Sequence, residues 1–258
     1  MTDKQHRDAI ARAACLLRRA RHAIALTGAG ISTPSGIPDF RSPGTGLWEK
    51  TDPMRVASFH AFRRHPEAFY EWIRPLAKTL VQAEPNPGHR ALARLEAAGY
   101  LEAVITQNID NLHQEAGSSE VLEVHGHLRS ATCIECYRVE SANGLTRQFL
   151  ASGEVPRCPE CGGAMKPDVV LFGEQLPVDV VNAAMAHVNS ADLMLVAGSS
   201  LEVVPVSRLP MRVHRQGGRL IVVNETRTYV DDAAEVVIHD DVARVLPRIA
   251  EACQAQDG

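Results

Sequence analysis

The chain has 258 residues, of which 45% are apolar and 22% are charged, and its mean hydropathy is −0.13. These proportions exclude collagen-like, low-complexity and intrinsically disordered chains. The net charge of −4, with no block of basic residues, does not call for a nucleic-acid-binding surface. No stretch approaches the roughly 18 apolar residues of a membrane helix. Residues 1–21 are charged throughout, so we expect neither a signal peptide nor a membrane anchor.

The predicted elements alternate between helices and short apolar strands. Residues 6–21 carry apolar side chains at helical spacing, which predicts an amphipathic opening helix. The apolar run Ala23–Thr27 predicts a strand that enters a glycine turn. Residues 87–98 predict a helix, with a proline near its start and Gly99 just beyond its end. Further strands are expected at Ala103–Thr106, 169–172, Leu193–Ala197 and 220–223, and further helices at 178–188 and 206–215.

Strands that are apolar on both faces and alternate with helices indicate a parallel sheet covered on both sides. Two stretches interrupt this alternation. Residues 127–166 hold four cysteines and predict a small inserted module, and residues 42–85 are rich in aromatic residues and predict a helical insertion. We therefore expect an α/β fold whose larger domain is discontinuous and consists of residues 1–41, 86–126 and 167–258.

Four of the six cysteines form two Cys-x-x-Cys pairs, Cys133 with Cys136 and Cys158 with Cys161, separated by 21 residues. This spacing resembles a zinc ribbon, in which two knuckles complete a tetrahedron of sulfur atoms around one Zn²⁺ ion. Four thiolates leave no position for water, so the ion would be structural. The alternative is a set of unligated buried or redox-active cysteines. Without a secretory signal a disulfide framework is the weaker explanation, and a reducing, cytoplasmic location fits best.

The glycine turn Gly28-Ala29-Gly30 follows a predicted strand and precedes a helix start, where backbone N–H groups can receive a phosphate. Taken alone this signal is weak, because Thr33 occupies the third glycine position of the dinucleotide-binding fingerprint. An ordinary glycine turn explains the stretch equally well.

A longer series of motifs resembles the sirtuins, the NAD-dependent protein deacylases, from about residue 23 to residue 245. The motifs occur in the family's order: Gly28-Ala29-Gly30-Ile31-Ser32, Gly36-Ile37-Pro38-Asp39-Phe40-Arg41, Thr106-Gln107-Asn108-Ile109-Asp110, His125-Gly126, the four cysteines, Phe172-Gly173-Glu174, Gly198-Ser199-Ser200 and Val223-Asn224. Each motif is modest alone, and their joint order is highly specific.

The resemblance implies a Rossmann-like NAD-binding domain and a smaller domain made of a zinc ribbon and a helical insertion. NAD and an acylated lysine would meet in the cleft between them. In this family NAD is a consumed co-substrate: the acyl oxygen attacks C1′ of the nicotinamide ribose and nicotinamide leaves. Attack by the ribose 2′-hydroxyl and hydrolysis then give free lysine and 2′-O-acyl-ADP-ribose. Catalysis would depend on positioning and on the exclusion of water.

His125 matches the family's general base, because a neutral imidazole can accept a proton from a ribose hydroxyl. His127 is the rival, since side chains two residues apart share one face of a strand. Asp110 and Ile109 match the positions that hold the nicotinamide carboxamide, by side chain and backbone respectively. Asn108 and Gln107 match neighbours of the ribose. These polar residues could instead cap the helix that follows the strand.

Phe40 matches the aromatic residue that shields C1′, and Arg41 matches a pyrophosphate contact suited to a guanidinium group. The other matches in the dinucleotide pocket are Gly28, Ala29, Thr33, Asp39, Gly198, Ser199 and Ser200, with Asn224 at the adenosine ribose and Val242 at the adenine. Ser199 and Ser200 stand where many sirtuins have Thr-Ser.

Two segments match those that flank the substrate, and an extended peptide would add between them as a strand. Their residues are Val170, Phe172, Gly173, Leu201 and Val203. The expected partners are therefore acetyl-lysine proteins or peptides, bound with low sequence selectivity, and neither nucleic acid nor a membrane.

The sequence of the helical insertion indicates which acyl group on the substrate lysine is preferred. Sirtuins that prefer malonyl- or succinyl-lysine carry Tyr-x-x-Arg there, whereas this chain has Tyr70 followed by Ile73 at the arginine position. A buried carboxylate without a partner is costly, so we expect acetyl-lysine to be preferred over succinyl-lysine. Arg74 leaves this open, because it lies on roughly the same helix face as Tyr70. Protein ADP-ribosylation through the same pocket and a non-enzymatic zinc-ribbon module are the alternatives.

Overall fold

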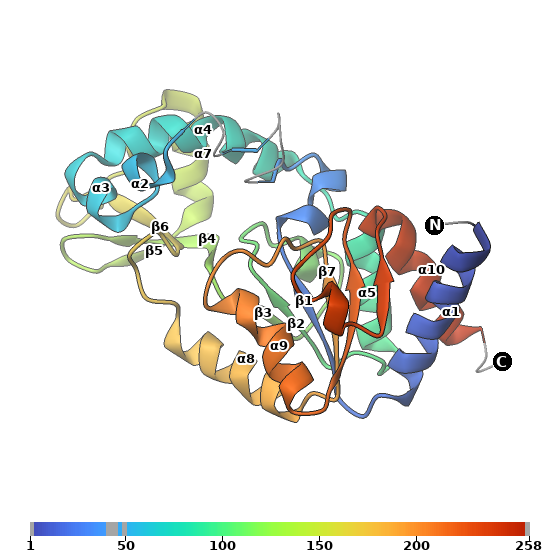
Figure 1. The fold of residues 1–258 in the computed structure, drawn as a ribbon. Coiled ribbons are helices and arrows are strands. Elements are labelled where there is room, and N and C mark those ends of the chain that lie inside the picture. Colours follow the sequence, from blue (N-terminus) through green and yellow to red (C-terminus); the bar gives the residue numbers. More distant parts are fainter. Residues whose placement is uncertain (1–2, 40–45, 48–50, 256–258) are drawn as a thin grey trace.

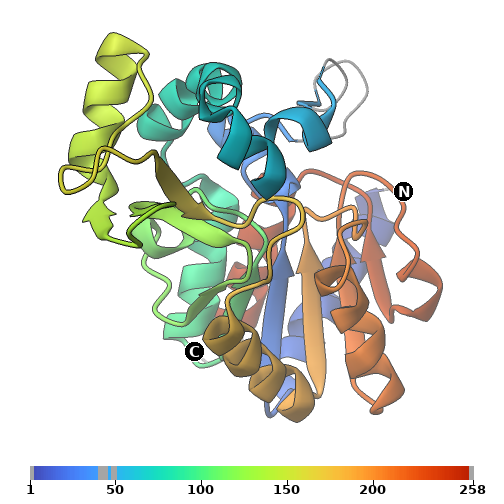
Figure 2. The same cartoon turned by 90° about the vertical axis from the view of Figure 1, so that its left-hand side faces the viewer.

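The structure, a computed structural model, describes residues 3–39, 46–47 and 51–255. Its larger part is a six-stranded, wholly parallel sheet in the order β3-β2-β1-β7-β8-β9 (Figures 1 and 2). The strands are β1 (Ala23–Thr27), β2 (Ala103–Thr106), β3 (Val121–Glu123), β7 (Leu193–Ala197), β8 (Arg219–Val223) and β9 (Val236–Ile238). The strand order reverses between β1 and β7, where a parallel sheet of this type binds its ligands. The predicted parallel sheet is confirmed.

Helices cover both faces of this sheet (Figure 1). Helices α1 (Asp3–Arg19), α5 (Pro87–Ala97) and α10 (Val242–Gln254) lie on one face, and α8 (Val178–Ser190) and α9 (Leu209–Arg215) on the other. Successive side chains of a strand point to opposite faces, so Ala25 joins the first core and Ile24 and Leu26 join the second. Both cores exclude water, which explains why the strands are apolar on both faces.

Local signals set the helix ends close to the predicted ones. Helix α5 begins after Asn86, whose side chain accepts a hydrogen bond from the Gly88 N–H (2.8 Å) while His89 Nδ1 accepts from the Asn86 N–H (3.4 Å). This is a capping box, with Pro87 at the first helical position. The helix expected at 206–215 is divided into a 3₁₀ turn, Val206–Arg208, and α9.

A second unit contains a three-stranded antiparallel sheet in the order β5-β4-β6. Its elements are β4 (Gly126–Cys133), β5 (Val139–Ser141), β6 (Met165–Val169), α7 (Ala142–Ser152), α2 (Pro53–Val56), α3 (Phe59–Arg64) and α4 (Pro66–Gln82). Phe62 and Tyr70 from the helical insertion pack with Phe149 of α7 in one shared core. The two insertions therefore form a single smaller unit beside the parallel sheet (Figure 1).

The strand expected at 169–172 is wrong as a member of the parallel sheet. Strand β6 ends at Val169 and pairs with β4 in antiparallel fashion. The run is apolar because Val169 and Leu171 are buried against the aromatic core of the smaller unit. The three-residue edge strands β3 and β9 were not predicted, since so short a run gives no clear period. Among the described residues, none of the helices is both long and apolar enough to span a membrane.

Candidate active site

Four strands of the parallel sheet are each followed directly by a residue that we predicted from the sequence to be functional. Gly28 follows β1, Gln107 follows β2, Gly198 follows β7 and Asn224 follows β8. Because the strands are parallel, all four positions lie on one edge of the sheet, at its carboxyl ends. This edge is where open parallel sheets bind ligands.

The two glycine turns contact each other with no space for side chains. A Cβ atom built on Gly30 would lie 2.9 Å from the Gly198 carbonyl oxygen, and one built on Gly28 would lie 2.9 Å from Ser199 Oγ. Gly198 has a φ of +62°, and a Cβ there would lie 2.3 Å from the backbone nitrogen of Ile31. Glycine is therefore required on both sides of this contact.

We expect Gly198→Ala to destabilise the fold on the order of 3 kcal/mol, because the new Cβ adds a backbone clash to the strain of a positive φ. Gly36→Ala is the matched control: Gly36 has a φ of +86° and nothing within 4 Å of its Cβ position, so only the conformational strain of about 1 kcal/mol remains. Urea unfolding of the two variants measures the difference. Equal losses would contradict the close contact.

A chain of buried hydrogen bonds connects the turn after β1 with the end of β2. Asn108 Nδ2 donates to the Gly28 carbonyl oxygen (3.1 Å) and to Ser32 Oγ (3.0 Å). Ser32 Oγ in turn donates to Asp110 Oδ2 at 2.6 Å. Burial raises the pKa of Asp110, and the bond from Ser32 opposes this shift.

The capping alternative for Asp110 is partly correct. Its Oδ1 accepts the Leu112 N–H at 3.0 Å, in the first turn of α6 (Leu112–Glu115). Its Oδ2 is the atom that accepts from Ser32. One carboxylate oxygen of Asp110 thus caps the helix and the other belongs to the hydrogen-bonded chain with Ser32 and Asn108. Helix capping and the predicted cofactor contact are therefore compatible.

His125 is connected to the same edge of the sheet. Its Nδ1 lies 3.1 Å from the Gln107 carbonyl oxygen. A carbonyl oxygen only accepts, so this bond places the proton on Nδ1 and leaves Nε2 as the basic nitrogen. Burial lowers the pKa of His125, and the bond to Gln107 opposes this shift. The side chain of Gln107 donates to Ser199 Oγ at 3.0 Å, which connects His125 to the end of β7.

A second polar group lies beneath the site and was not predicted as functional. Thr27 Oγ1 donates to Thr106 Oγ1 (2.8 Å) and lies 2.9 Å from His113 Nε2. The His113 and His89 rings are 4.8 Å apart, and burial lowers the pKa of His89 to about 4. Both threonines are the last residues of buried strands, and polar residues at that position are the signal that could have revealed the group.

The other predicted cofactor residues lie in varied surroundings. The backbone of Asp39 accepts a hydrogen bond from Leu47, and Asn224 Nδ2 donates to the Thr226 carbonyl oxygen at 2.8 Å. Thr33 and Ser200 are exposed, Ala29 and Ile109 are half-buried, and the Val242 side chain is buried in the core beside α1 and α5. Phe40 and Arg41 lie outside the described residues.

The predicted peptide-binding segments contact the smaller unit and the proposed base. Val170 donates its N–H to the His125 carbonyl oxygen at 2.8 Å. Phe172 forms a parallel bridge with Ser58, and the residue is 37% exposed. Gly173 is exposed and Val203 is half-buried, whereas the Leu201 side chain is buried in the core under α8 and α9.

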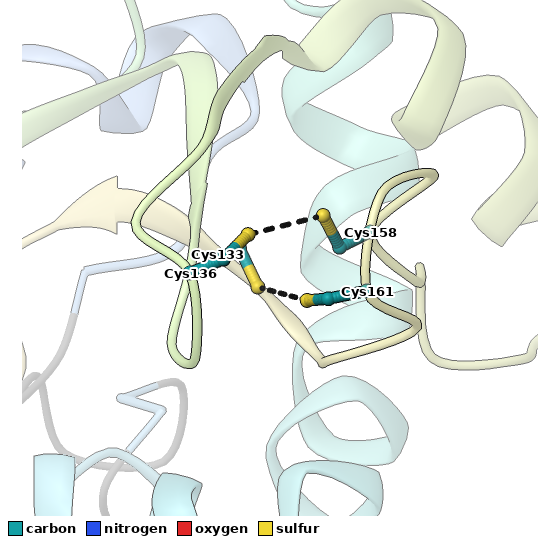
Figure 3. A group of neighbouring side chains, drawn as sticks. All are labelled: Cys133, Cys136, Cys158 and Cys161. Atoms are coloured by element: carbon teal, nitrogen blue, oxygen red, sulfur yellow. Dashed lines mark hydrogen bonds between the residues drawn. The ribbon is translucent and has the colours of Figure 1, made fainter.

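The four paired cysteines converge on one point, from the turn after β4 and from the loop before β6 (Figure 3). All four sulfur atoms lie within 4.8 Å of one another. Cys133 Sγ is 3.5 Å from Cys161 Sγ, and Cys136 Sγ is 3.6 Å from Cys158 Sγ. Tetrahedral Zn–S bonds of about 2.3 Å require sulfur atoms somewhat under 4 Å apart, so the set fits one zinc ion.

Comparisons with known proteins agree with this geometry. The family model described as Sir2 family matches residues 28–205. The chain is 48% identical to a protein of Sulfolobus acidocaldarius named NAD-dependent protein deacetylase, over 91% of each chain. A solved structure of a Sir2 enzyme superposes with a TM-score of 0.91 at 43% identity and covers 96% of this chain and 99% of its own. A solved complex of Sir2 with a p53 peptide and NAD⁺ has a TM-score of 0.85 at 40% identity and covers both chains fully.

Proposed function

Because this chain belongs to the Sir2 family, we propose that it is an NAD-dependent protein-lysine deacetylase. Its products would be nicotinamide, 2′-O-acetyl-ADP-ribose and the free lysine. One observation carries the proposal: a single hydrogen-bonded network joins the glycine turn, Asn108, Ser32 and Asp110 at the edge of the sheet where His125 is also held. The relative named a deacetylase and the solved complex with NAD⁺ and a peptide support it.

The site fits a dinucleotide. The turns at Gly28 and Gly198 pack closely against each other, and backbone N–H groups at turns of this kind suit an anion such as a pyrophosphate. We assign the nicotinamide carboxamide to Asp110 and the Ile109 backbone, and the nicotinamide ribose to Gln107 and Asn108. We assign the other residues matched by sequence to the rest of the dinucleotide, Phe40 and Arg41 among them although they lie outside the described residues: Gly28, Ala29, Thr33, Asp39, Phe40, Arg41, Gly198, Ser199, Ser200, Asn224 and Val242.

In the proposed reaction the acyl carbonyl oxygen bonds to C1′ as the bond from C1′ to the nicotinamide nitrogen breaks. His125 Nε2 then accepts the proton of a ribose hydroxyl, whose oxygen adds to the imidate carbon, and water releases the lysine amine. The buried setting of His125 favours the neutral form that this step needs. Asp110 and Asn108 would contribute by orientation rather than by proton transfer.

We propose that Cys133, Cys136, Cys158 and Cys161 hold one structural Zn²⁺ ion. The Glu135 N–H lies 3.4 Å from Cys133 Sγ, and a hydrogen bond of this kind favours the thiolate form that binds metal. The ion would join the knuckle after β4 to the loop before β6, in a module with only a small core of its own. Thiolates that bind zinc must stay reduced, and the cytoplasmic location that we propose would keep them so.

The acyl group should be acetyl rather than succinyl. Tyr70 donates its hydroxyl hydrogen to the Met165 carbonyl oxygen at 2.6 Å, and burial raises its pKa. Arg74 donates to the Leu150 carbonyl oxygen at 3.0 Å and lines a cavity with Glu67 and Arg157. Among the described residues, Tyr70 and Arg74 thus each have a backbone carbonyl partner in the smaller unit, so we propose that neither pairs with an acyl carboxylate.

We expect the protein to deacetylate a generic acetyl-lysine peptide only when NAD is supplied, with inhibition by nicotinamide. On a matched succinyl-lysine peptide kcat/KM should be at least about tenfold lower, because the carboxylate would be desolvated without a partner. Chromatography with mass detection measures both rates and identifies the products. A succinyl preference would overturn the acyl assignment, and ADP-ribosylated protein without free lysine would favour a transferase instead.

A further inference from the structure

The segment of residues 169–174 is held to both neighbouring parts of the molecule by its backbone. Val170 donates to the His125 carbonyl oxygen at 2.8 Å. Phe172 donates to the Ala57 carbonyl oxygen at 2.9 Å and accepts from the Phe59 N–H at 3.0 Å. The segment is therefore attached to the residue of the proposed base on one side and to the helical insertion on the other.

A partly buried ion pair holds the same segment at its two ends. Lys166 Nζ lies 3.1 Å from Glu174 Oε2 and also donates to the carbonyl oxygens of Val169 (2.9 Å) and Pro167 (3.1 Å). The same Glu174 oxygen accepts the Leu171 N–H at 2.8 Å. The side chains are only 12% and 20% exposed, so water screens this pair less than a surface ion pair.

Besides each other, Lys166 and Glu174 contact mainly the backbone of residues 167–171, at the start of one short loop. The loop has no strand or helix of its own after Val169, and it closes with a turn in which the Glu174 N–H donates to the Leu171 carbonyl oxygen at 3.0 Å. Gly173, in that turn, has a φ of +86° and is exposed. Among the described residues no hydrogen bond reaches the Gly173 backbone, so its N–H and carbonyl remain available to an added strand.

We propose that Lys166 and Glu174 are positioning residues for the acyl-lysine substrate. The ion pair keeps residues 169–174 in one conformation, so that an extended peptide finds a preformed edge already aligned with His125. Without the pair, the peptide would have to order this loop as it binds, and its affinity would fall. The inference rests on the proposed function, because it assigns this loop to the peptide.

Two variants test the pair. Lys166→Met removes the charge and keeps most of the side-chain length, and Glu174→Gln removes the charge at nearly constant shape. We expect each to raise the Kd of an acetyl-lysine peptide by about tenfold, with the ADP-ribose Kd and the kcat at saturating peptide within about twofold of wild type. Calorimetry and steady-state kinetics give these numbers. Lys166→Arg, which keeps the donors, should recover most of the affinity.

Glu67→Gln is the matched control, because it removes another ion pair of the smaller unit, to Arg157 at 3.3 Å, without touching residues 169–174. It should leave the peptide Kd unchanged. If Lys166→Met or Glu174→Gln fails to fold, Glu174→Asp is measured instead, because its shorter side chain draws the carboxylate away from Lys166. A smaller rise in peptide Kd is then expected, and an unchanged value would overturn the inference.

Three results would overturn the inference. The first is an unchanged peptide Kd in the folded variants, and the second is an equal loss of peptide and ADP-ribose affinity, which would assign the pair a general stabilising role. In either of these two cases the proposed function still stands, provided that the wild-type protein deacetylates the peptide. The third is a wild-type protein that binds ADP-ribose but no acetyl-lysine peptide, which would remove the proposed function as well.

Discussion

His125→Ala is expected to lower the deacetylation rate by about 10²–10⁴-fold, the range over which a positioned general base contributes. The loss should fall on kcat, because in the proposed reaction the ribose proton is transferred only after both substrates are bound. The NAD site that we propose is formed by the turns after β1, β2 and β7, so ADP-ribose affinity and thermal stability should remain close to wild type. Stopped assays at saturating NAD and peptide, with calorimetry for ADP-ribose, separate the two effects.

His127→Ala provides the control, since His127 lies two residues away on β4 and is the rival candidate. It should retain most of the activity. Wild-type-like turnover by His125→Ala, together with loss of turnover by His127→Ala, would move the base to the rival position.

The same assignment predicts the acid side of the pH profile. The base acts in its neutral form, and burial lowers the pKa of His125. Activity should therefore persist as the pH falls through 6.5, the ordinary value for histidine, and decline only below it. A decline of kcat/KM for the peptide centred above 6.5 would contradict a buried, neutral base.

Removal of zinc is expected to have the largest effect on stability. Structural zinc sites contribute on the order of 10 kcal/mol, which is comparable to the whole free energy of unfolding of a typical domain. Cys158→Ser, or a strong chelator acting on wild type, should lower the thermal midpoint sharply and abolish activity. Elemental analysis should give one zinc per wild-type chain and less in the variant.

Cys15→Ser is the matched control, because Cys15 is half-buried in α1 and far along the chain from the cluster. It should keep both its zinc and its thermal midpoint. A wild-type protein that is folded and active without metal would show that the four sulfur atoms meet for another reason.

The parallel sheet and its edge residues could be predicted because both depend on local patterns. Strands buried on both faces are apolar throughout, as in Leu193–Ala197, and the carboxyl ends of parallel strands must share an edge. Gly28, Gln107 and Gly198 therefore come together once the strands are recognised. The meeting of the two cysteine pairs was also predictable, because each Cys-x-x-Cys pair is a local unit and the proposed zinc site would bring the two together.

The sequence by itself thus determined the fold class, the family and the residues that gather at the sheet edge. Only the tertiary structure decided which of their atoms remain available. In the structure, one oxygen of Asp110 accepts a hydrogen bond at a helix start, and Arg74 donates to the Leu150 carbonyl oxygen. Residues 169–172 belong to the smaller unit and not, as we had predicted, to the parallel sheet. The difference has a physical reason. The spacing of apolar residues along the chain indicates which side chains are buried, whereas the hydrogen-bond partner of a polar atom depends on segments distant in the chain.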